Sequence, residues 1–276
     1  MFIKAGTKSG NCSMNDERKS NMRFIDSHCH LHHRKFNKDR SLLLERIVES
    51  EVSAFIEVPI GLRSNSDMRE KIALPQVYFA AGVHPLKVED LETPGAWEQV
   101  RKFAEMENTV AVGETGLDDR TLRRELQEDC FKQFIEMALE LDKPLILHLR
   151  GDGAYGRALE TLRERQCRYK GVLHCFHGDI REAEPFLELG FCLGIGGLVT
   201  YEEEEKLREA VAQIPLEKIL LETDSPFLKP EACVGDKRNT PLNIPVIAEE
   251  IAGIKGIAVG RVVEETVLNT KRVFGI

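Results

Sequence analysis

Residues 144–176 of the chain, PLILHLRGDGAYGRALETLRERQCRYKGVLHCF, contain one strand–helix–strand unit. The apolar runs Pro144–Arg150 and Gly171–Phe176 have the length of buried strands, and the amphipathic run Ala154–Gln166 between them has the length of a helix. Two successive strands that are joined by a helix normally lie parallel in one sheet. The stretch therefore predicts an α/β protein with a parallel sheet.

The same unit repeats through the rest of the chain. Strand-like runs are predicted at Phe24–His30, Ala54–Ile60, Val77–Val83, Val110–Gly116, Pro144–Arg150, Gly171–Phe176, Phe191–Gly197 and Lys218–Asp224. Helical patterns separate or follow them at Arg40–Glu51, Glu125–Leu141, Ala154–Gln166, Ile180–Leu189, Glu203–Gln213, Pro245–Ile254 and Val259–Val273. Eight alternating units favour a closed (β/α)8 TIM barrel over an open sheet.

Length and composition predict one barrel domain over residues 23–276. Of the 276 residues 42% are hydrophobic, which is ample for a large core, and no linker or change of composition interrupts the repeated units. Residues 1–22 are rich in Lys, Ser, Asn and Gly and show no periodicity. We therefore expect a flexible N-terminal extension at 1–22.

Cysteine content and charge limit the classes of function. The seven cysteines are odd in number and contain no Cys-x-x-Cys pair, which is typical of reduced thiols. No stretch approaches the roughly 18 consecutive apolar residues of a membrane span, and residues 1–22 lack the apolar core of a secretion signal. We expect a cytoplasmic protein with no membrane association and no obligate protein partner. The formal net charge of −8 excludes an extended basic surface for nucleic acid, so any contact with DNA is expected to be local.

Six residues that can bind metal ions occur at the ends of predicted strands. His28 and His30 are separated by one residue on the first strand, so both point into the barrel while Cys29 points outward. The carboxyl ends of barrel strands meet at one mouth, where the active sites of this fold lie. Four other strands each end in one further candidate ligand, namely Glu114, His148, His174 and Asp224.

The composition of this set indicates its chemistry. Four imidazoles and two carboxylates are too many for one ion, and a structural zinc site would use four ligands, often cysteines. Mixed ligation by His and carboxylates is typical of a two-metal hydrolytic centre. The set therefore predicts two divalent ions per chain, with Zn²⁺, Mn²⁺ and Mg²⁺ all open. For any single residue, the alternative is an ordinary core or surface position.

Five motifs carry a resemblance to a known family: Asp26-Ser-His-Cys-His-Leu31, Gly113-Glu-Thr-Gly-Leu-Asp118, His148-Leu-Arg150, His174-Cys-Phe-His-Gly178 and Glu222-Thr-Asp-Ser-Pro226. With Gly82-Val-His-Pro85 and Gly235-Asp-Lys-Arg-Asn-Thr-Pro241 they span nearly all of residues 24–276. The chain resembles the TatD family of metal-dependent deoxyribonucleases. The resemblance implies a barrel hydrolase with two divalent ions and carries metal ligation onto His28, His30, Glu114, His148, His174 and Asp224. Asp119, His177 and Leu86 depart from residues that are common in the family.

Position on the barrel predicts the role of each residue. Glu114, midway between the histidines of the first strand and those of the later strands, is expected to bridge the two ions. One ion is then expected on His28, His30, Glu114 and Asp224, and the other on Glu114, His148 and His174. Asp224 is also expected to orient or deprotonate the attacking water.

Residues around the ligands are expected to support them or to hold the substrate. Asp26 and Glu222 each precede a ligand by two residues and are expected to orient the metal ligands, with a buried ion pair as the alternative. His32 and His33 are expected to be solvated loop residues. Phosphate contacts are expected from Arg150, His84, Lys237, Arg238 and Asn239.

The resulting hypothesis is a metal-dependent hydrolase that cleaves phosphodiester bonds of DNA, acting on single strands or ends as a 3′–5′ exonuclease. One alternative is an amidohydrolase or lactonase that acts on a small molecule, although its usual bridge is a carbamylated lysine where this chain has Glu114. A second alternative is a barrel that binds metal without turnover. Activity assays with added metal distinguish the three.

Overall fold

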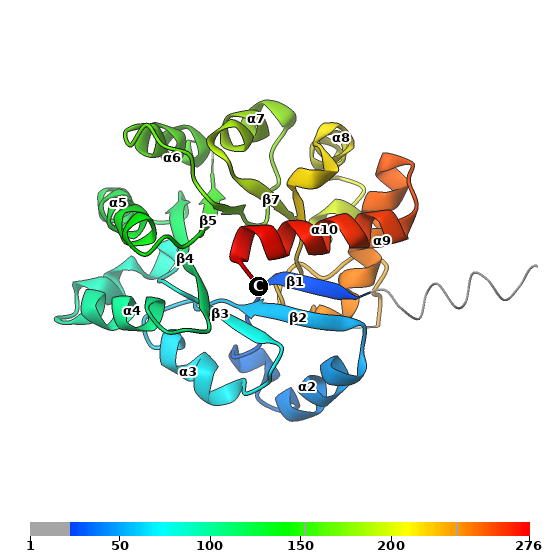
Figure 1. The fold of residues 1–276 in the computed structure, drawn as a ribbon, viewed down its shortest axis with the longest axis horizontal. Helices are drawn as coiled ribbons and strands as arrows, with labels where there is room; N and C mark the ends of the chain where they lie inside the picture. The colour runs from blue at the N-terminus through cyan, green and yellow to red at the C-terminus, as the bar shows by residue number, and fades with distance from the viewer. Residues whose placement is uncertain (1–22, 152, 236) are drawn as a thin grey trace, which may run out of the picture.

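The computed structural model describes residues 23–151, 153–235 and 237–276, so the predicted extension 1–22 lies outside the described residues. A parallel sheet of eight strands, neighbours in chain order, occupies the centre of this part of the chain (Figure 1). The sheet closes where Cys29 forms an isolated parallel bridge with Ser225. The predicted (β/α)8 TIM barrel is confirmed. Its strands are β1 Phe24–Cys29, β2 Val52–Glu57, β3 Val77–Ala81, β4 Thr109–Asp118, β5 Leu145–Arg150, β6 Gly171–Leu173, β7 Cys192–Ile195 and β8 Ile219–Leu221.

Helices surround the barrel and close one of its ends. Figure 1 shows α2 to α9 as a ring around the strands and α10 crossing the barrel. Val273 and Phe274 of α10 belong to the buried cluster inside the barrel, against which Tyr78 and Val110, near the starts of β3 and β4, also pack. Helix α10 therefore covers the amino end. The helices are α2 Arg40–Glu49, α3 Ser64–Lys71, α4 Ala96–Ala104, α5 Arg124–Glu140, α6 Ala154–Arg163, α7 Ile180–Leu189, α8 Glu205–Gln213, α9 Ile244–Lys255 and α10 Val259–Phe274.

The predicted helices agree with α2 and α5 to α10 to within three residues at each end. In the described part of the chain, no helix combines the length and the apolar character that a membrane crossing requires.

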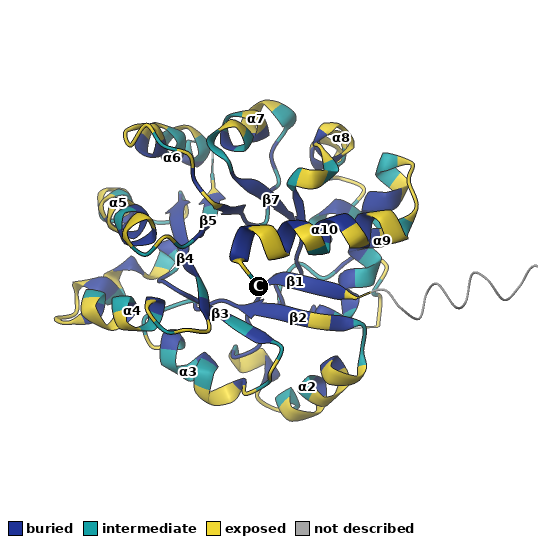
Figure 2. Ribbon diagram, viewed as in Figure 1, coloured by how far each residue is buried: buried dark blue, intermediate teal, exposed yellow. Residues whose placement is uncertain are grey.

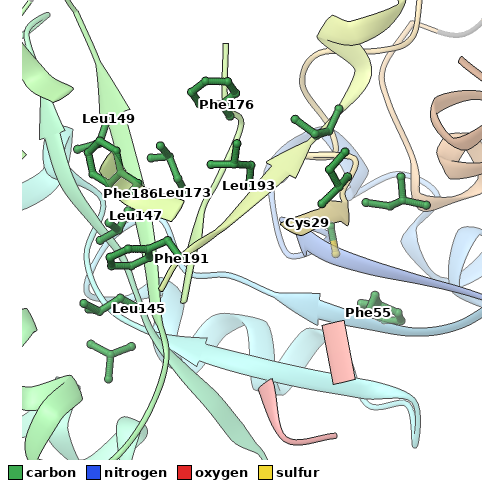
Figure 3. Packing of buried hydrophobic residues seen from close by; sticks show 14 of the residues in the cluster. Cys29, Phe55, Leu145, Leu147, Leu149, Leu173, Phe176, Phe186, Phe191 and Leu193 are labelled. Atoms are coloured by element: carbon green, nitrogen blue, oxygen red, sulfur yellow. The ribbon is translucent and has the colours of Figure 1, made fainter. Parts of the chain in front are cut away.

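Successive side chains of each strand point to opposite faces of the sheet, which divides the buried residues into an outer core, between sheet and helices, and an inner core, inside the barrel. Leu147 and Leu149 of β5 pack between the sheet and the helices, whereas Ile146 lies inside the barrel. Figure 3 shows the two leucines in one cluster with Phe186 and Phe191, and Figure 2 shows buried strands inside helices whose outer faces are exposed. Burial of each leucine contributes about 1.5–3 kcal/mol. The next inward position is His148, so the packing that fixes β5 also directs this imidazole toward the barrel axis.

Six of the eight described strands end before their predicted limits, among them β6 and β8, which end before their candidate ligands. The predicted runs Gly171–Phe176 and Lys218–Asp224 shorten to β6 and β8, which end at Leu173 and Leu221. Cys175 and Asp224 have φ values of 49° and 53°, and this conformation takes the chain out of the strand ladder. The candidate ligands of these two units therefore follow their strands rather than belonging to them.

Candidate metal centre

The six predicted ligands converge at the carboxyl end of the barrel. They come from β1, β4 and β5 and from the segments that follow β1, β6 and β8, so closure of the barrel brings them together. Their ligand atoms form overlapping groups of three whose members lie within 4.8 Å of one another. These groups are His28, His174 and Asp224; His28, His30 and Glu114; and Glu114, His148 and His174.

Glu114 lies between two sets of imidazoles, with one carboxylate oxygen toward each. Its Oε2 atom lies 3.4 Å from Nε2 of His28 and 3.8 Å from Nε2 of His30. Its Oε1 atom lies 2.7 Å from Nδ1 of His148 and 3.4 Å from Nε2 of His174. A carboxylate in such a position can be shared by two cations.

Asp224 forms the more accessible edge of the group. Its Oδ1 atom lies 3.2 Å from Nε2 of His30 and 3.9 Å from Nε2 of His28. The Asp224 side chain is 13% exposed, against 2% for Glu114. Of these two carboxylates, Asp224 is therefore the better placed to meet a water molecule or a substrate.

The ring of His30 is held so that one nitrogen faces the group. Its Nδ1 atom lies 2.7 Å from the carbonyl oxygen of Val58. Because a carbonyl oxygen only accepts hydrogen bonds, Nδ1 donates, and Nε2 is the nitrogen directed at Asp224 and Glu114. This is the arrangement that a metal-binding histidine requires.

Two carboxylates hold the rings of His148 and His174 in the same manner. Oδ2 of Asp118 lies 3.0 Å from Nε2 of His148, and Oε1 of Glu222 lies 3.1 Å from Nδ1 of His174. Glu222 also accepts a 2.6 Å hydrogen bond from the backbone N–H of Cys175. Carboxylates that hold the distal nitrogen of a histidine fix both its tautomer and its orientation.

Burial and neighbouring charges together shift the pKa values of the buried residues in this group. Burial raises the pKa of Glu114, but the surrounding imidazoles outweigh burial and hold this pKa well below its ordinary value. Burial lowers the pKa of His30, but the hydrogen bond and the charge of Asp224 outweigh it and raise the pKa to about 9. Burial, together with the charge of His174, lowers the pKa of His28. These shifts favour an ionised Glu114, a protonated His30 and a neutral His28 near neutral pH.

The residues of the group fit divalent cations. Oε2 of Glu114 and Nδ1 of His28 are buried and have no hydrogen-bond partner within the described part of the chain. Leaving a buried polar atom unpaired costs about 1–3 kcal/mol, and more for a charged group. A cation beside Oε2 would remove that cost, and imidazole and carboxylate donors suit the divalent metals of hydrolases.

A pocket of about 380 Å³ opens above the group. Two residues that were predicted to contact phosphate, Arg150 and His84, line this pocket. The side chain of Arg150 is exposed, whereas His84 caps a local turn, since its Nδ1 accepts a 3.0 Å hydrogen bond from the N–H of Leu86. Burial lowers the pKa of His84 to about 3, so its ring is neutral near pH 7.

Three other residues that were predicted to contact phosphate lie elsewhere. Asn239 is buried and donates a 2.6 Å hydrogen bond to the carbonyl oxygen of Thr223, so its amide holds the segment after β8 together, contrary to the prediction. Lys237 and Arg238 line a different hollow, in which Arg238 forms an ion pair with Asp39. Their place in the loop after β8 does not by itself show which cavity they line, and the structure puts both outside the pocket above Glu114.

Asp26 acts on the backbone rather than on a ligand ring. Its carboxylate accepts hydrogen bonds from the hydroxyl and the N–H of Thr223, at 2.6 Å and 2.9 Å, and lies 3.3 Å from the N–H of His28. Asp26 therefore ties β1 to the segment after β8, where Asp224 lies. Glu222, by contrast, contacts the His174 ring directly, as described above.

The prediction for His32 was wrong. His32 is buried, and its Nδ1 atom lies 2.7 Å from Oε1 of Glu57. Glu57 also accepts a 2.9 Å hydrogen bond from the N–H of Leu31. The partner that buries His32 lies on β2, so the sequence around His32 does not reveal it. His33 is half-buried and accepts a hydrogen bond from the N–H of Lys35.

Asp118 received no role from the sequence, although a signal was present. It lies four residues after Glu114, and positions 114, 116 and 118 share one face of a strand. The predicted strand ended at Gly116, whereas β4 continues to Asp118. A longer strand would have placed Asp118 beside the ligands.

Comparisons with known proteins agree with this geometry. A family model described as TatD related DNase matches residues 25–275. The chain is 37% identical over 264 residues to the uncharacterized metal-dependent hydrolase YcfH of Escherichia coli (strain K12), which covers 92% of this chain and 97% of that protein. It is 32% identical over 258 residues to the uncharacterized metal-dependent hydrolase YabD of Bacillus subtilis (strain 168), covering 91% and 99%. The crystal structure of YjjV, a TatD homolog from Escherichia coli K12, superposes with a TM-score of 0.83 at 27% identity, covering 92% of this chain and 99% of that one.

Proposed function

This chain belongs to the TatD related DNase family of metal-dependent hydrolases, and we propose that it hydrolyses phosphodiester bonds of DNA as a 3′–5′ exonuclease on single strands. The observation that carries the proposal is the position of Glu114, whose two carboxylate oxygens face two different sets of imidazoles. A centre for two cations suits displacement at phosphorus, where the attacking and the leaving oxygen both need stabilisation.

In this proposal the six residues would hold two divalent cations. His28, His30 and Asp224 would hold one of them with Glu114, and His148 and His174 would hold the other with the same carboxylate. Cations bound there would supply an acidified water and charge stabilisation for the phosphate oxygens.

The chain's own residues then divide the remaining tasks. Asp224 accepts the proton of the attacking water, because its carboxylate is the more exposed of the two in the group. Asp118 and Glu222 keep the rings of His148 and His174 oriented throughout the reaction. Arg150 extends from the end of β5 into the pocket and binds a phosphate oxygen of the substrate.

Charge and shape support a flexible DNA strand as the substrate. Lys87 and Arg150 line the pocket and give an anionic polymer a local attraction in a chain of net charge −8, whereas Arg120, also in the lining, is paired with Asp118. Glu114 is almost fully buried at the base of the pocket, so a diester must enter a recess to reach it. A strand end or an unpaired strand enters such a recess more readily than the middle of a stiff duplex.

The proposal is tested with protein loaded separately with Mn²⁺, Mg²⁺ or Zn²⁺. The substrates are a 5′-labelled single-stranded oligodeoxynucleotide, the same sequence as a duplex, a lactone and an amide. Stepwise shortening of the labelled single strand supports the proposal. A single internal cut would instead show that the protein is an endonuclease. Hydrolysis of the lactone or the amide without cleavage of DNA would make this chain a small-molecule hydrolase instead.

A further inference from the structure

A second hollow, of about 300 Å³, lies at the carboxyl end of the barrel. Its walls come from α2 and from the segments that follow β1 and β8, so it opens at the same end as the pocket above Glu114. Within the described residues, the two cavities have no lining residue in common. The walls of the second hollow include Asp39, Leu42, Arg46, Lys237, Arg238 and Leu242.

Lys35 connects the two cavities. Its Nζ atom lies 4.9 Å from the ring centroid of Phe227, which lines the pocket above the metal centre. Its carbonyl oxygen accepts a 3.2 Å hydrogen bond from Nη1 of Arg238, which lines the second hollow. Lys35 therefore contacts a lining residue of each cavity, and its side chain adds a positive charge beside Phe227.

The second hollow carries an excess of positive charge. Among the lining residues that the structure describes, Arg46, Lys237 and Arg238 contribute three cationic side chains and Asp39 one carboxylate, a difference of +2. Arg238 is already bound to Asp39, and its guanidinium lies 4.6 Å from the ring centroid of Phe36. Arg46 and Lys237 are exposed and form no ion pair with the residues that the structure describes. Two cations are thus available to an anionic ligand.

The hollow also offers apolar surface beside these cations. Leu42 on α2 is 59% exposed, and Leu242 lies at the start of the segment that leads into α9. A volume of about 300 Å³ lies at the lower end of the range for small-ligand pockets. Cations next to apolar side chains suit a nucleotide, which has a charged phosphate and a flat apolar base face.

We propose that this hollow is a second phosphate subsite, which holds a single DNA strand a short distance from the diester at the metal centre. The proposal rests on the function proposed above. Arg46 and Lys237 bind a phosphate of the strand, Leu42 contacts a base or sugar, and the strand passes Lys35 and Phe227 on its way to Glu114. Lys237 therefore serves a neighbouring phosphate rather than the one that is cleaved, while Arg238 shapes the wall through its contacts with Asp39 and Phe36.

The test compares a substrate that can reach only the metal centre with one that can reach both sites. The first is p-nitrophenyl thymidine 5′-phosphate, which contains a single diester, and the second is a single-stranded oligodeoxynucleotide. The variants are Arg46→Gln and Lys237→Gln, each of which removes one charge without breaking the pair between Arg238 and Asp39. The control is Lys132→Gln, the same change in charge at an exposed position on α5, on the other side of the helical ring (Figure 1).

We expect the ratio of kcat/KM for the oligonucleotide to kcat/KM for the single diester to fall about fivefold in each variant. The slope of log affinity against log salt for the oligonucleotide should become shallower by about 0.7 for each cation removed. Lys132→Gln should change neither quantity. An unchanged ratio and an unchanged slope in both variants would overturn the proposal.

A binding measurement separates this proposal from the proposed function. Fluorescence anisotropy of a labelled oligonucleotide, recorded in Ca²⁺ buffer, requires no turnover. Weaker binding by Arg46→Gln and Lys237→Gln supports the subsite even if the metal centre hydrolyses another substrate. Equal binding by these variants and the wild type contradicts the subsite even if the protein proves to be a nuclease.

Discussion

The imidazole ring of His28 stacks on that of His174, with ring centroids 3.6 Å apart and planes inclined by 15°. The two rings come from β1 and from the segment after β6, so the contact joins distant parts of the barrel. Burial and the charge of His174 lower the pKa of His28. Burial and the neighbouring His174 therefore favour the neutral form of His28, which is the form in which an imidazole binds a metal ion.

Glu114→Gln should weaken both proposed cation sites at once. The amide keeps the shape of the side chain but removes the charge that two sets of imidazoles share. We expect about one bound ion per chain or fewer after metal loading, and hydrolysis reduced at least about 100-fold. Inductively coupled plasma mass spectrometry measures the metal content. Glu89→Gln, at an exposed carboxylate, is the matched control, and two tightly held ions in Glu114→Gln would refute the shared ligand.

Asp118→Ala should lower metal affinity although Asp118 is not a proposed ligand. The substitution removes the acceptor that holds Nε2 of His148, so the ring loses its fixed orientation. Loss of such an acceptor typically costs about 10–100-fold in metal affinity or activity. Asp118→Asn keeps an oxygen acceptor and should lie between Ala and wild type. Titration with Mn²⁺ measures the affinities, and equal affinities in all three proteins would show that His148 needs no such support.

Arg150→Ala should reduce cleavage of DNA without loss of metal. The Arg150 side chain is exposed in the pocket and belongs to none of the candidate ligand groups among the described residues. A positioned charge at a phosphate commonly contributes about 100-fold to turnover. Steady-state kinetics on the single-stranded oligonucleotide and metal analysis of the same samples provide the measurement. Full activity in this variant would remove Arg150 from the substrate site.

Asp119→Asn should destabilise the fold only at pH values at which the wild-type Asp119 carboxylate is ionised. Asp119 lies 2.7 Å from Nη2 of Arg157 and accepts a 3.3 Å hydrogen bond from the N–H of Gly153. Burial raises the pKa of Asp119, but Arg157 outweighs it and lowers the pKa below its ordinary 3.8. Because the folded-state pKa is depressed, the stabilisation is present above the ordinary pKa and is lost as the pH falls through the folded-state value.

We therefore expect Asp119→Asn to lower the free energy of unfolding by about 1 kcal/mol near neutral pH, with a difference that shrinks once the pH falls below 3.8. Urea titrations at several pH values measure it. Asp142→Asn is the control, because the Asp142 side chain is 83% exposed in its pair with Lys170 and should contribute less. A difference that does not change with pH would exclude the charge of Asp119 as the cause.

The barrel could be predicted because each strand–helix unit is encoded locally, by apolar runs and amphipathic spacing. The convergence of the six candidate ligands followed from that fold, since each lies in the carboxyl-terminal half of a strand or in the segment that follows one. Contacts between neighbouring units could not be predicted. His32 is buried only because Glu57 on β2 receives it, and Asn239 is internal only because the chain folds back to Thr223. A sequence shows the polarity of such side chains but not the partner that satisfies them.

The position of α10 determines when this protein can finish folding during its synthesis. β1 is made early, yet it pairs with the segment after β8, and Val273 and Phe274 cover the inner core later still. While α10 remains in the ribosome, the amino end of the barrel exposes apolar surface that chaperones recognise. The six candidate ligands, which run from His28 to Asp224, can therefore come together only after β8 and the segment that follows it have been synthesised, and the inner core is covered later, when α10 follows.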